Sequence, residues 1–170
     1  MKAGKIILFV ILVICFFVQW MVPLGNMFHY LDAKKNGASY LFKVVPRDPY
    51  DPFKGRYVLL NSEGVDSYYP NYPDPTGYAV VENQGAYARI TALSREKPGQ
   101  GNYFKVSLRR QRLVMPFDRY YLNENIAPLV ENAMRRGDGE FHIDLRVKDG
   151  TAVIAGLYIQ GIPVEEYFAD

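Results

Sequence analysis

The chain has 170 residues, of which 49% are hydrophobic and 22% charged, a length typical of one ordinary domain rather than of a multidomain enzyme. Its single cysteine excludes an internal disulfide framework and a cysteine-rich zinc ribbon, and its two histidines exclude a histidine-rich metal centre. Twenty basic residues against 18 acidic ones give a net charge of only +2, which is too balanced for a dedicated nucleic-acid-binding protein. We therefore expect no nucleic-acid partner, no metal and no cofactor.

An apolar segment near the start of the sequence predicts a membrane-spanning helix. Residues 6–22 are apolar apart from Gln19, and they follow Lys2 and Lys5. A helix of this length is about 26 Å long at about 1.5 Å per residue, so it covers a hydrocarbon core of roughly 30 Å once Leu24 or some local thinning is included. Because a polar side chain in the apolar core prefers a helical partner, Gln19 is a candidate for contact with another membrane helix.

A cleaved signal peptide is the competing interpretation of this segment. Such a peptide needs small residues just before its cleavage site, and residues 19–24 offer none, so we expect an uncleaved signal anchor. The lysines before the segment favour a cytoplasmic amino terminus by the positive-inside rule. The chain is then expected to be a single-pass protein of the cytoplasmic (inner) membrane. Residues 1–30 would form the cytoplasmic tip and anchor, and residues 31–170 an extracytoplasmic, periplasmic domain.

The remainder of the sequence predicts an α+β fold: a β-rich, mostly antiparallel domain with one amphipathic helix. Its basic and acidic residues balance, which gives no general electrostatic reason to bind DNA, RNA or an anionic bilayer. Asn83-Gln84-Gly85 suits a hairpin loop with Gly85 in the left-handed conformation. Short apolar runs bounded by turn residues predict strands at 40–45, 57–60, 78–81, 86–93 and 103–114.

Residues 141–159 predict a β-hairpin. Apolar and polar side chains alternate along 141–148, so one face of this strand is expected to be buried and the other solvated. The polar face comprises His142, Asp144, Arg146 and Lys148. Asp149-Gly150 predicts a type I′ turn, since both central positions need a positive φ. The register that follows pairs Lys148 with Thr151, Val147 with Ala152, Leu145 with Ile154 and Ile143 with Gly156. Leu157 and Ile159 then fall on the opposite face of the return strand, which is expected to be covered on both sides.

Residues 125–136 predict the amphipathic helix. Asn125 is the expected N-cap, Pro128 lies in the first turn and Gly137 follows as a stop signal. A helix packed on a sheet is the favoured interpretation, and a partner-binding helix is the alternative. The apolar stripe of this helix comprises Ile126, Leu129, Val130, Ala133 and Met134.

A proline-rich turn after the first strand is one candidate binding site. Asp48 and Asp51 each precede a proline, which biases them toward extended geometry and frees their carboxylates for local backbone donors. Gly55 suggests a turn before the strand that begins at Tyr57. These residues form structural turns or a partner surface; half of a cation site is the least favoured reading, because hard cations want six or more oxygens.

Residues 62–77 predict a loop, since three prolines interrupt them and no apolar period is present. Tyr68, Tyr69 and Tyr72 make this loop the second candidate binding site. Tyrosine supplies large contact area with little rotamer entropy to lose, and proline reduces the ordering cost of binding. The alternatives are that the rings fold back over a small core or that they contact a glycan.

No residue pattern indicates catalysis. Ser39 and Lys105 are the best candidates for a Ser–Lys dyad of the kind that membrane-anchored peptidases use. However, Ser39 lacks the expected Met-x-Pro context, and Lys105 alternates onto a polar strand face. The carboxylate pairs Asp118 with Glu124 and Glu165 with Glu166 share no evident cleft. We expect a non-enzymatic accessory or binding protein, with a membrane-anchored hydrolase or peptidase as the alternative and a glycan or lipid binder as a third reading.

The sequence resembles the GDYXXLXY family along nearly its whole length. That family has a membrane helix, a Pro-x-Asp-Pro turn, and then Gly-Asp-Tyr followed by alternating strand residues. The turn is matched by Pro46, Asp48, Pro49 and Asp51, and the naming motif by Gly55, Tyr57 and Leu60; Arg56 and Ser62 depart from it. Residues 119–124, 148–150 and 156–157 also resemble the family. The resemblance implies a bacterial membrane-anchored protein without established catalytic residues, often encoded near multi-span membrane proteins. We therefore expect a multi-span membrane or envelope protein as partner.

Overall fold

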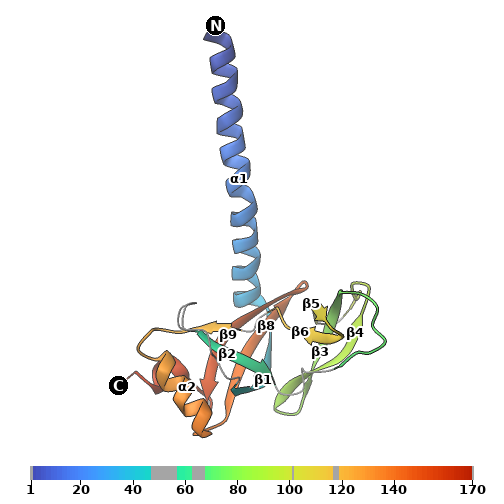
Figure 1. Ribbon diagram of the computed structural model, residues 1–170, viewed down its shortest axis with the longest axis vertical. Coiled ribbons are helices and arrows are strands. Elements are labelled where there is room, and N and C mark those ends of the chain that lie inside the picture. The colour runs from blue at the N-terminus through green and yellow to red at the C-terminus, as the bar shows by residue number, and fades with distance from the viewer. Residues whose placement is uncertain (1, 47–56, 63–67, 101, 117–118, 170) are drawn as a thin grey trace.

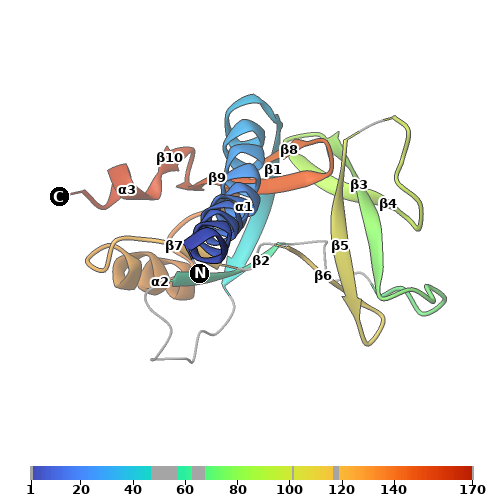
Figure 2. The same ribbon diagram turned by 90° about the horizontal axis from the view of Figure 1, so that it is seen from above.

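The computed structural model describes residues 2–46, 57–62, 68–100, 102–116 and 119–169 of the chain. One long helix stands on a β-rich domain (Figure 1). Seen along that helix, two shorter helices lie to one side of it and the smaller of two sheets to the other (Figure 2). The α+β class and the antiparallel pairing of the strands are as expected from the sequence.

The elements occur in this order: α1 (Lys2–Asn36), β1 (Ala38–Pro46), β2 (Tyr57–Ser62), β3 (Thr76–Gln84), β4 (Tyr87–Ser94), β5 (Tyr103–Arg109), β6 (Arg112–Val114), β7 (Arg119–Tyr121), α2 (Ala127–Arg136), β8 (Phe141–Lys148), β9 (Thr151–Ile159), β10 (Ile162–Pro163) and α3 (Val164–Tyr167).

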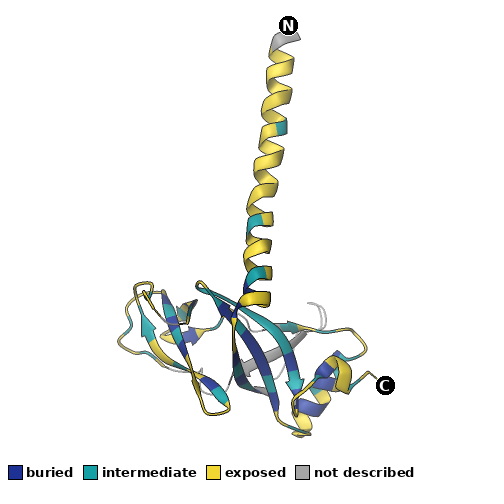
Figure 3. Cartoon of the chain, turned by 180° about the vertical axis from the view of Figure 1, so that it is seen from behind, coloured by how far each residue is buried: buried dark blue, intermediate teal, exposed yellow. Residues whose placement is uncertain are grey.

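Helix α1 is one continuous helix of 35 residues, which corresponds to about 52 Å at about 1.5 Å per residue. Its apolar side chains are exposed along nearly its whole length (Figure 3). The helix is therefore long and apolar enough to span a membrane. It continues through Pro23 and past residue 30, the expected end of the anchor, and it ends at Asn36. Gly37 then donates its N–H to the carbonyl of Ala33 at 2.9 Å.

The strands form two antiparallel sheets around one core. The larger sheet has the order β10-β9-β8-β1-β2-β7, and the smaller has the order β4-β3-β5-β6. A single hydrophobic cluster joins the inner face of β1 and β8 to the smaller sheet and to α2. Phe42 and Ile143, which pair across β1 and β8, and Phe104 of β5 are fully buried in it. The two sheets and α2 therefore form one domain.

The β8–β9 hairpin follows the expected register only as far as Leu145. Asp149 and Gly150 have φ values of 50° and 86°, as a type I′ turn requires, and the first pairs form as expected. Beyond Leu145 a β-bulge shifts the register, so that Ile143 faces Leu157. One extra residue reverses the side to which each later side chain points. Leu157 and Ile159 are therefore fully buried on the core face, and their expected position on the opposite face was wrong.

The segment 103–114, which the sequence predicts as one strand, is a hairpin. β5 ends at Arg109 and β6 begins at Arg112, and the two residues between them, Arg110 and Gln111, have φ values of 52° and 61°. Two successive positive φ values are typical of a type I′ turn, which normally contains Asn or Gly. Because neither residue is a turn former, the sequence gives no sign of this turn. The hairpin between β3 and β4 forms as the sequence predicts, with Gly85 in the left-handed conformation at a φ of 74°.

Helix α2 begins at Ala127, two residues later than expected. Asn125 is not the N-cap; Ile126 occupies that position without a side-chain hydrogen bond, and the preceding turn is held by the carbonyl of Asn123. The C-terminal end is as expected, with Gly137 in the left-handed conformation at a φ of 73°. Leu129 is 46% exposed, so the buried stripe is narrower than the sequence predicts.

Candidate functional site

The loop before β3 presents one tyrosine to solvent and holds it in place. Tyr68 is 60% exposed, and its hydroxyl donates to the side-chain carbonyl of Gln111 at 2.7 Å. The backbone of Tyr68 forms a bridge with Arg112, and Tyr69 donates its N–H to the carbonyl of Gln111 at 2.9 Å. The turn between β5 and β6 therefore supports this end of the 68–75 loop, as we name the described part of the segment.

Tyr72 fixes the middle of the 68–75 loop. Its hydroxyl donates to the carbonyl of Ser94 at 2.9 Å, on the strand beyond β3. Its ring lies against Gly77, where an added Cβ would come within 2.4 Å of the tyrosine oxygen. A glycine is therefore needed for this approach. Burial raises the pKa of the Tyr72 hydroxyl above its ordinary value.

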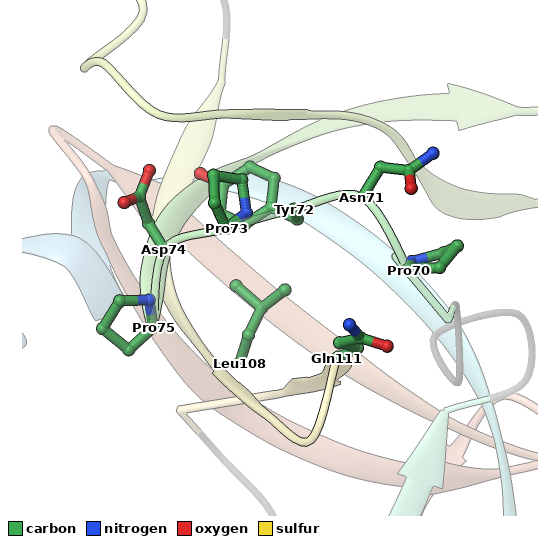
Figure 4. Close-up of a pocket in the computed structure, with 8 residues that line it drawn as sticks. All are labelled: Pro70, Asn71, Tyr72, Pro73, Asp74, Pro75, Leu108 and Gln111. Carbon is green, nitrogen blue, oxygen red and sulfur yellow. The ribbon is translucent and has the colours of Figure 1, made fainter.

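A hollow of about 390 Å³ opens beneath the 68–75 loop (Figure 4). Leu108 forms an apolar part of its wall, and Asp74, which pairs with Arg95 at 3.0 Å, marks its far end. The carbonyl of Pro75 accepts the N–H of Leu108 at 2.8 Å, which ties this end of the loop to β5. The lining residues are Pro70, Asn71, Tyr72, Pro73, Asp74, Pro75, Leu108 and Gln111.

The three candidate tyrosines of the 68–75 loop are placed in two ways: two rings fold back onto the protein, and one faces solvent. Tyr69 packs against the core and Tyr72 folds back onto Ser94, whereas Tyr68 faces outward. Of the other candidate binding residues, Asp48, Asp51 and Gly55 lie outside the described residues. Tyr57 begins β2, where it pairs with Tyr121 of β7.

The polar face of β8 is not solvated as the sequence predicts. Asp144 is only 5% exposed, and its carboxylate accepts hydrogen bonds from Ser39 at 2.5 Å and from Arg146 at 2.9 Å. The second guanidinium branch of Arg146 reaches the carbonyl of Gly37 at 3.4 Å. The prediction failed because the residues that follow α1 cover this part of the strand.

A second set of contacts ties α1 itself to the same hairpin. Lys148 forms an ion pair with Asp32 at 2.6 Å, and Asn36 donates to the other carboxylate oxygen of Asp32, also at 2.6 Å. Ala33 is buried at this contact, and an added Cβ on Gly37 would lie 3.0 Å from the backbone nitrogen of Val147. Sequence reasoning missed this junction, although Asp32 and Asn36 share one helix face just beyond an apolar segment.

His142 belongs to an aromatic stack on the outer face of the large sheet. Its ring lies parallel to that of Tyr158, at 5.3 Å between centroids and 5° between planes, and Tyr87 of β4 lies 6.3 Å away. Burial lowers the pKa of His142, while Glu140 and Asp144 act in the opposite direction. The imidazole is therefore neutral at neutral pH and packs as an aromatic ring.

Of the residues considered for catalysis, the structure describes Ser39, Lys105, Glu124, Glu165 and Glu166. Ser39 and Lys105 are both exposed, and the hydroxyl of Ser39 donates to Asp144 rather than to a lysine base. Glu165 accepts the hydroxyl of Tyr120 at 2.8 Å, and burial of that hydroxyl raises the pKa of Tyr120. Asp118 lies outside the described residues. Among the residues that are described, no group of three or more His, Cys, Asp or Glu side chains is placed to hold a metal ion.

Comparison with known proteins gives a match to a protein family. A family model described as GDYXXLXY protein matches residues 19–157, from the last turns of the apolar segment to the buried part of β9. No curated protein and no solved structure matches the chain.

Proposed function

The chain belongs to the GDYXXLXY protein family, and from that premise we propose that it is a single-pass protein of the cytoplasmic membrane that binds another membrane or envelope protein through its extracytoplasmic domain. The 68–75 loop is the proposed contact surface. The observation that carries this proposal is an outward-facing tyrosine on a surface loop that is itself held at both ends.

The anchoring part of the proposal is supported by α1. Its large apolar side chains surround the helix instead of lying on one stripe, which is typical of a segment in lipid and not of one packed on a domain. Two lysines precede the apolar segment, which favours a cytoplasmic amino terminus. Gln19 is exposed within the segment and offers a polar contact to a partner helix.

The binding part of the proposal is supported by the geometry of the 68–75 loop. Backbone or side-chain hydrogen bonds fix it to Gln111, to Ser94 and to Leu108. A loop that is already ordered loses little conformational entropy when a partner binds. Tyr68 provides an aromatic contact beside a hollow with one apolar wall, so an extended segment of a partner protein could rest against Tyr68 and place a side chain in the hollow.

Site-specific photo-crosslinking in intact membranes tests this function. A benzophenone amino acid at position 68 is expected to yield one discrete adduct with a multi-span membrane or envelope protein. The matched control is the same probe at position 121, because Tyr121 is 68% exposed but lies on β7, away from the loop. The same adducts from both positions, or only abundant membrane proteins, would contradict the proposal.

A substitution series at the same residue completes the test. Tyr68→Ala is expected to abolish co-purification of the crosslinked partner, and Tyr68→Phe to preserve it, because the proposed contact uses the ring. Retention of the partner by Tyr68→Ala would show that the loop is not the contact surface. The orientation of the chain in the membrane is tested separately. A reporter that is active only outside the cytoplasm is fused to the chain after Asp170.

A further inference from the structure

A pocket of about 320 Å³ lies where α1 meets the turn between β8 and β9. The helix contributes five of its lining residues and the hairpin three, and the Asp32–Lys148 ion pair crosses from one to the other. We name it the junction pocket. Its lining residues are Asn26, His29, Tyr30, Asp32, Ala33, Lys148, Asp149 and Thr151.

The position of the junction pocket along α1 places it at the level of lipid headgroups. If residues 6–24 are centred in the bilayer, a hydrocarbon core of roughly 30 Å ends near residue 25 at about 1.5 Å per residue. The interfacial layer, which brings the total thickness to about 40–45 Å, then ends near residue 29. Asn26 and His29 therefore lie within the headgroup layer, and Asp32 lies just outside it.

The groups that line the junction pocket suit a ligand that carries one negative and one positive charge. Lys148 and the side chains of His29 and Thr151 offer hydrogen-bond donors to a phosphate. Asp149 is exposed at the hairpin turn, and no described residue forms an ion pair with it. One lysine and two aspartates give the lining more acidic than basic side chains, which disfavours a purely anionic ligand.

The surface of α1 just above the pocket suits the rest of a lipid. Val22 and Val18 precede Asn26 by about one and two helical turns on the same side of the helix, and they are 66% and 56% exposed, so acyl chains can run along this side toward the bilayer centre. The pocket volume lies at the small end of the range for small-molecule sites, which is sufficient for a headgroup of a few heavy atoms.

We propose that the junction pocket binds the headgroup of a zwitterionic, primary-amine phospholipid, with its phosphate toward Lys148 and His29 and its ammonium group toward Asp149. This site rests on the proposed membrane anchoring but not on the proposed partner. It fixes the domain against the membrane surface, because α1 and the β8–β9 turn hold the same lipid.

Native mass spectrometry of the full chain, purified from membranes in detergent, tests this site. Added phosphatidylethanolamine is expected to give a bound population about tenfold larger than phosphatidylcholine or phosphatidylglycerol at equal concentration. Phosphatidylcholine lacks the ammonium donors, and phosphatidylglycerol lacks the positive charge. Equal binding of the three lipids would overturn the proposal.

The variant Asp149→Asn separates the site from the fold. Asn tolerates the positive φ of this turn position, so the hairpin is preserved while the charge is lost. The phosphatidylethanolamine preference is expected to disappear in this variant and to persist in Asp138→Asn, which changes an exposed aspartate between α2 and β8. An unchanged preference in Asp149→Asn would refute the site. Displacement of the lipid by an equal concentration of soluble phosphoethanolamine would overturn the lipid as its ligand, because the acyl chains would then contribute nothing to binding.

The fraction from which the protein is recovered distinguishes the two proposals. Recovery from the soluble fraction would contradict the anchoring on which the site depends. Recovery from membranes without a headgroup preference would overturn the lipid site alone and leave the anchoring proposal standing.

Discussion

Ser39 and Asp144 are separated by 105 positions in the sequence, yet the hydroxyl of Ser39 donates directly to the carboxylate of Asp144. Ser39 is the second residue of β1, directly after the end of α1, and Asp144 lies at the middle of β8, where it is nearly fully buried. The other oxygen of this carboxylate accepts a hydrogen bond from Arg146. The carboxylate therefore joins the segment that follows α1 to β8, an inner strand of the large sheet. The helix is thus connected to the domain by polar bonds as well as by chain continuity.

Removal of the Asp144 carboxylate is expected to destabilise the domain strongly. Asp144→Ala leaves the guanidinium of Arg146 half-buried without its anion and should reduce the free energy of unfolding by about 3 kcal/mol. Ser39→Ala removes one hydrogen bond and should cost about 1 kcal/mol. Urea titration of the detergent-solubilised chain measures both. A loss of less than about 1 kcal/mol for Asp144→Ala would contradict the buried pair.

Gly37 is expected to accept no side chain. A Cβ at this position would lie 2.4 Å from the carbonyl oxygen of Ala33 and 3.2 Å from the Cβ of Arg146, so Gly37→Ala must displace α1 from β8. We expect a loss of about 1–3 kcal/mol in the free energy of unfolding. Gly99→Ala is the control, because an added Cβ there meets nothing within 4 Å. Equal stability of the two variants would count against the close approach at the junction.

Because of the β-bulge in β9, alanine substitutions at Leu157 and Val153 should differ in their cost to stability. Leu157 is fully buried, whereas Val153, before the bulge, lies on the outer face and is partly exposed. Leu157→Ala should cost about 2–5 kcal/mol and Val153→Ala about 1 kcal/mol. Deletion of Ala155, the residue between the shifted pairs, should cost less than Leu157→Ala, because it removes the bulge and leaves Leu157 opposite Ile143 on the core face. Equal costs for the two alanine variants would favour an unbulged register.

Acid is expected to weaken the domain through His142. Its pKa is lowered in the folded state, so the unfolded chain takes up the proton at higher pH, and stability falls as the pH drops below about 6.5. His142→Phe keeps a ring against Tyr158 without titrating, so the loss of stability between pH 7 and pH 5 should shrink. The lowered pKa of Glu140, caused by Lys43 and Tyr87, acts only below its ordinary value of 4.5. An identical pH profile for the variant would refute the assignment.

The tyrosines of the 68–75 loop should differ in their effect on stability. Tyr72→Phe removes the hydrogen bond to the carbonyl of Ser94 and should cost about 1 kcal/mol. Tyr68→Phe removes only an exposed bond to Gln111 and should change the free energy of unfolding by less than about 0.5 kcal/mol. Thermal unfolding followed by circular dichroism compares the two variants. If Tyr68→Phe were the more destabilising, Tyr68 would be part of the scaffold and not a surface available for binding.

Local signals in the sequence were sufficient for most of the elements. The apolar segment predicts α1, the Asp149-Gly150 pair predicts the type I′ turn, and Gly137 predicts the end of α2, because each depends on residues that are neighbours along the chain. The turn at Arg110 and Gln111 escaped prediction, since neither residue type favours a positive φ and pairing with the rest of the sheet imposes it.

The candidate site was only partly accessible from the sequence. The tyrosines identify the 68–75 loop, but which ring faces solvent depends on Gln111 and Ser94, which are distant in sequence and become neighbours only when β3, β4, β5 and β6 pair.

By itself, the sequence determined a long apolar helix, an α+β domain and membership of a family, since hydrophobic periodicity and turn chemistry are local properties. Only the tertiary structure decided that Asp144 is buried, that Asp32 pairs with Lys148 and that a bulge returns Leu157 to the core. These features follow from which surfaces cover one another after folding, and the free energy of burying a charge or shifting a register depends on partners that lie far away along the chain.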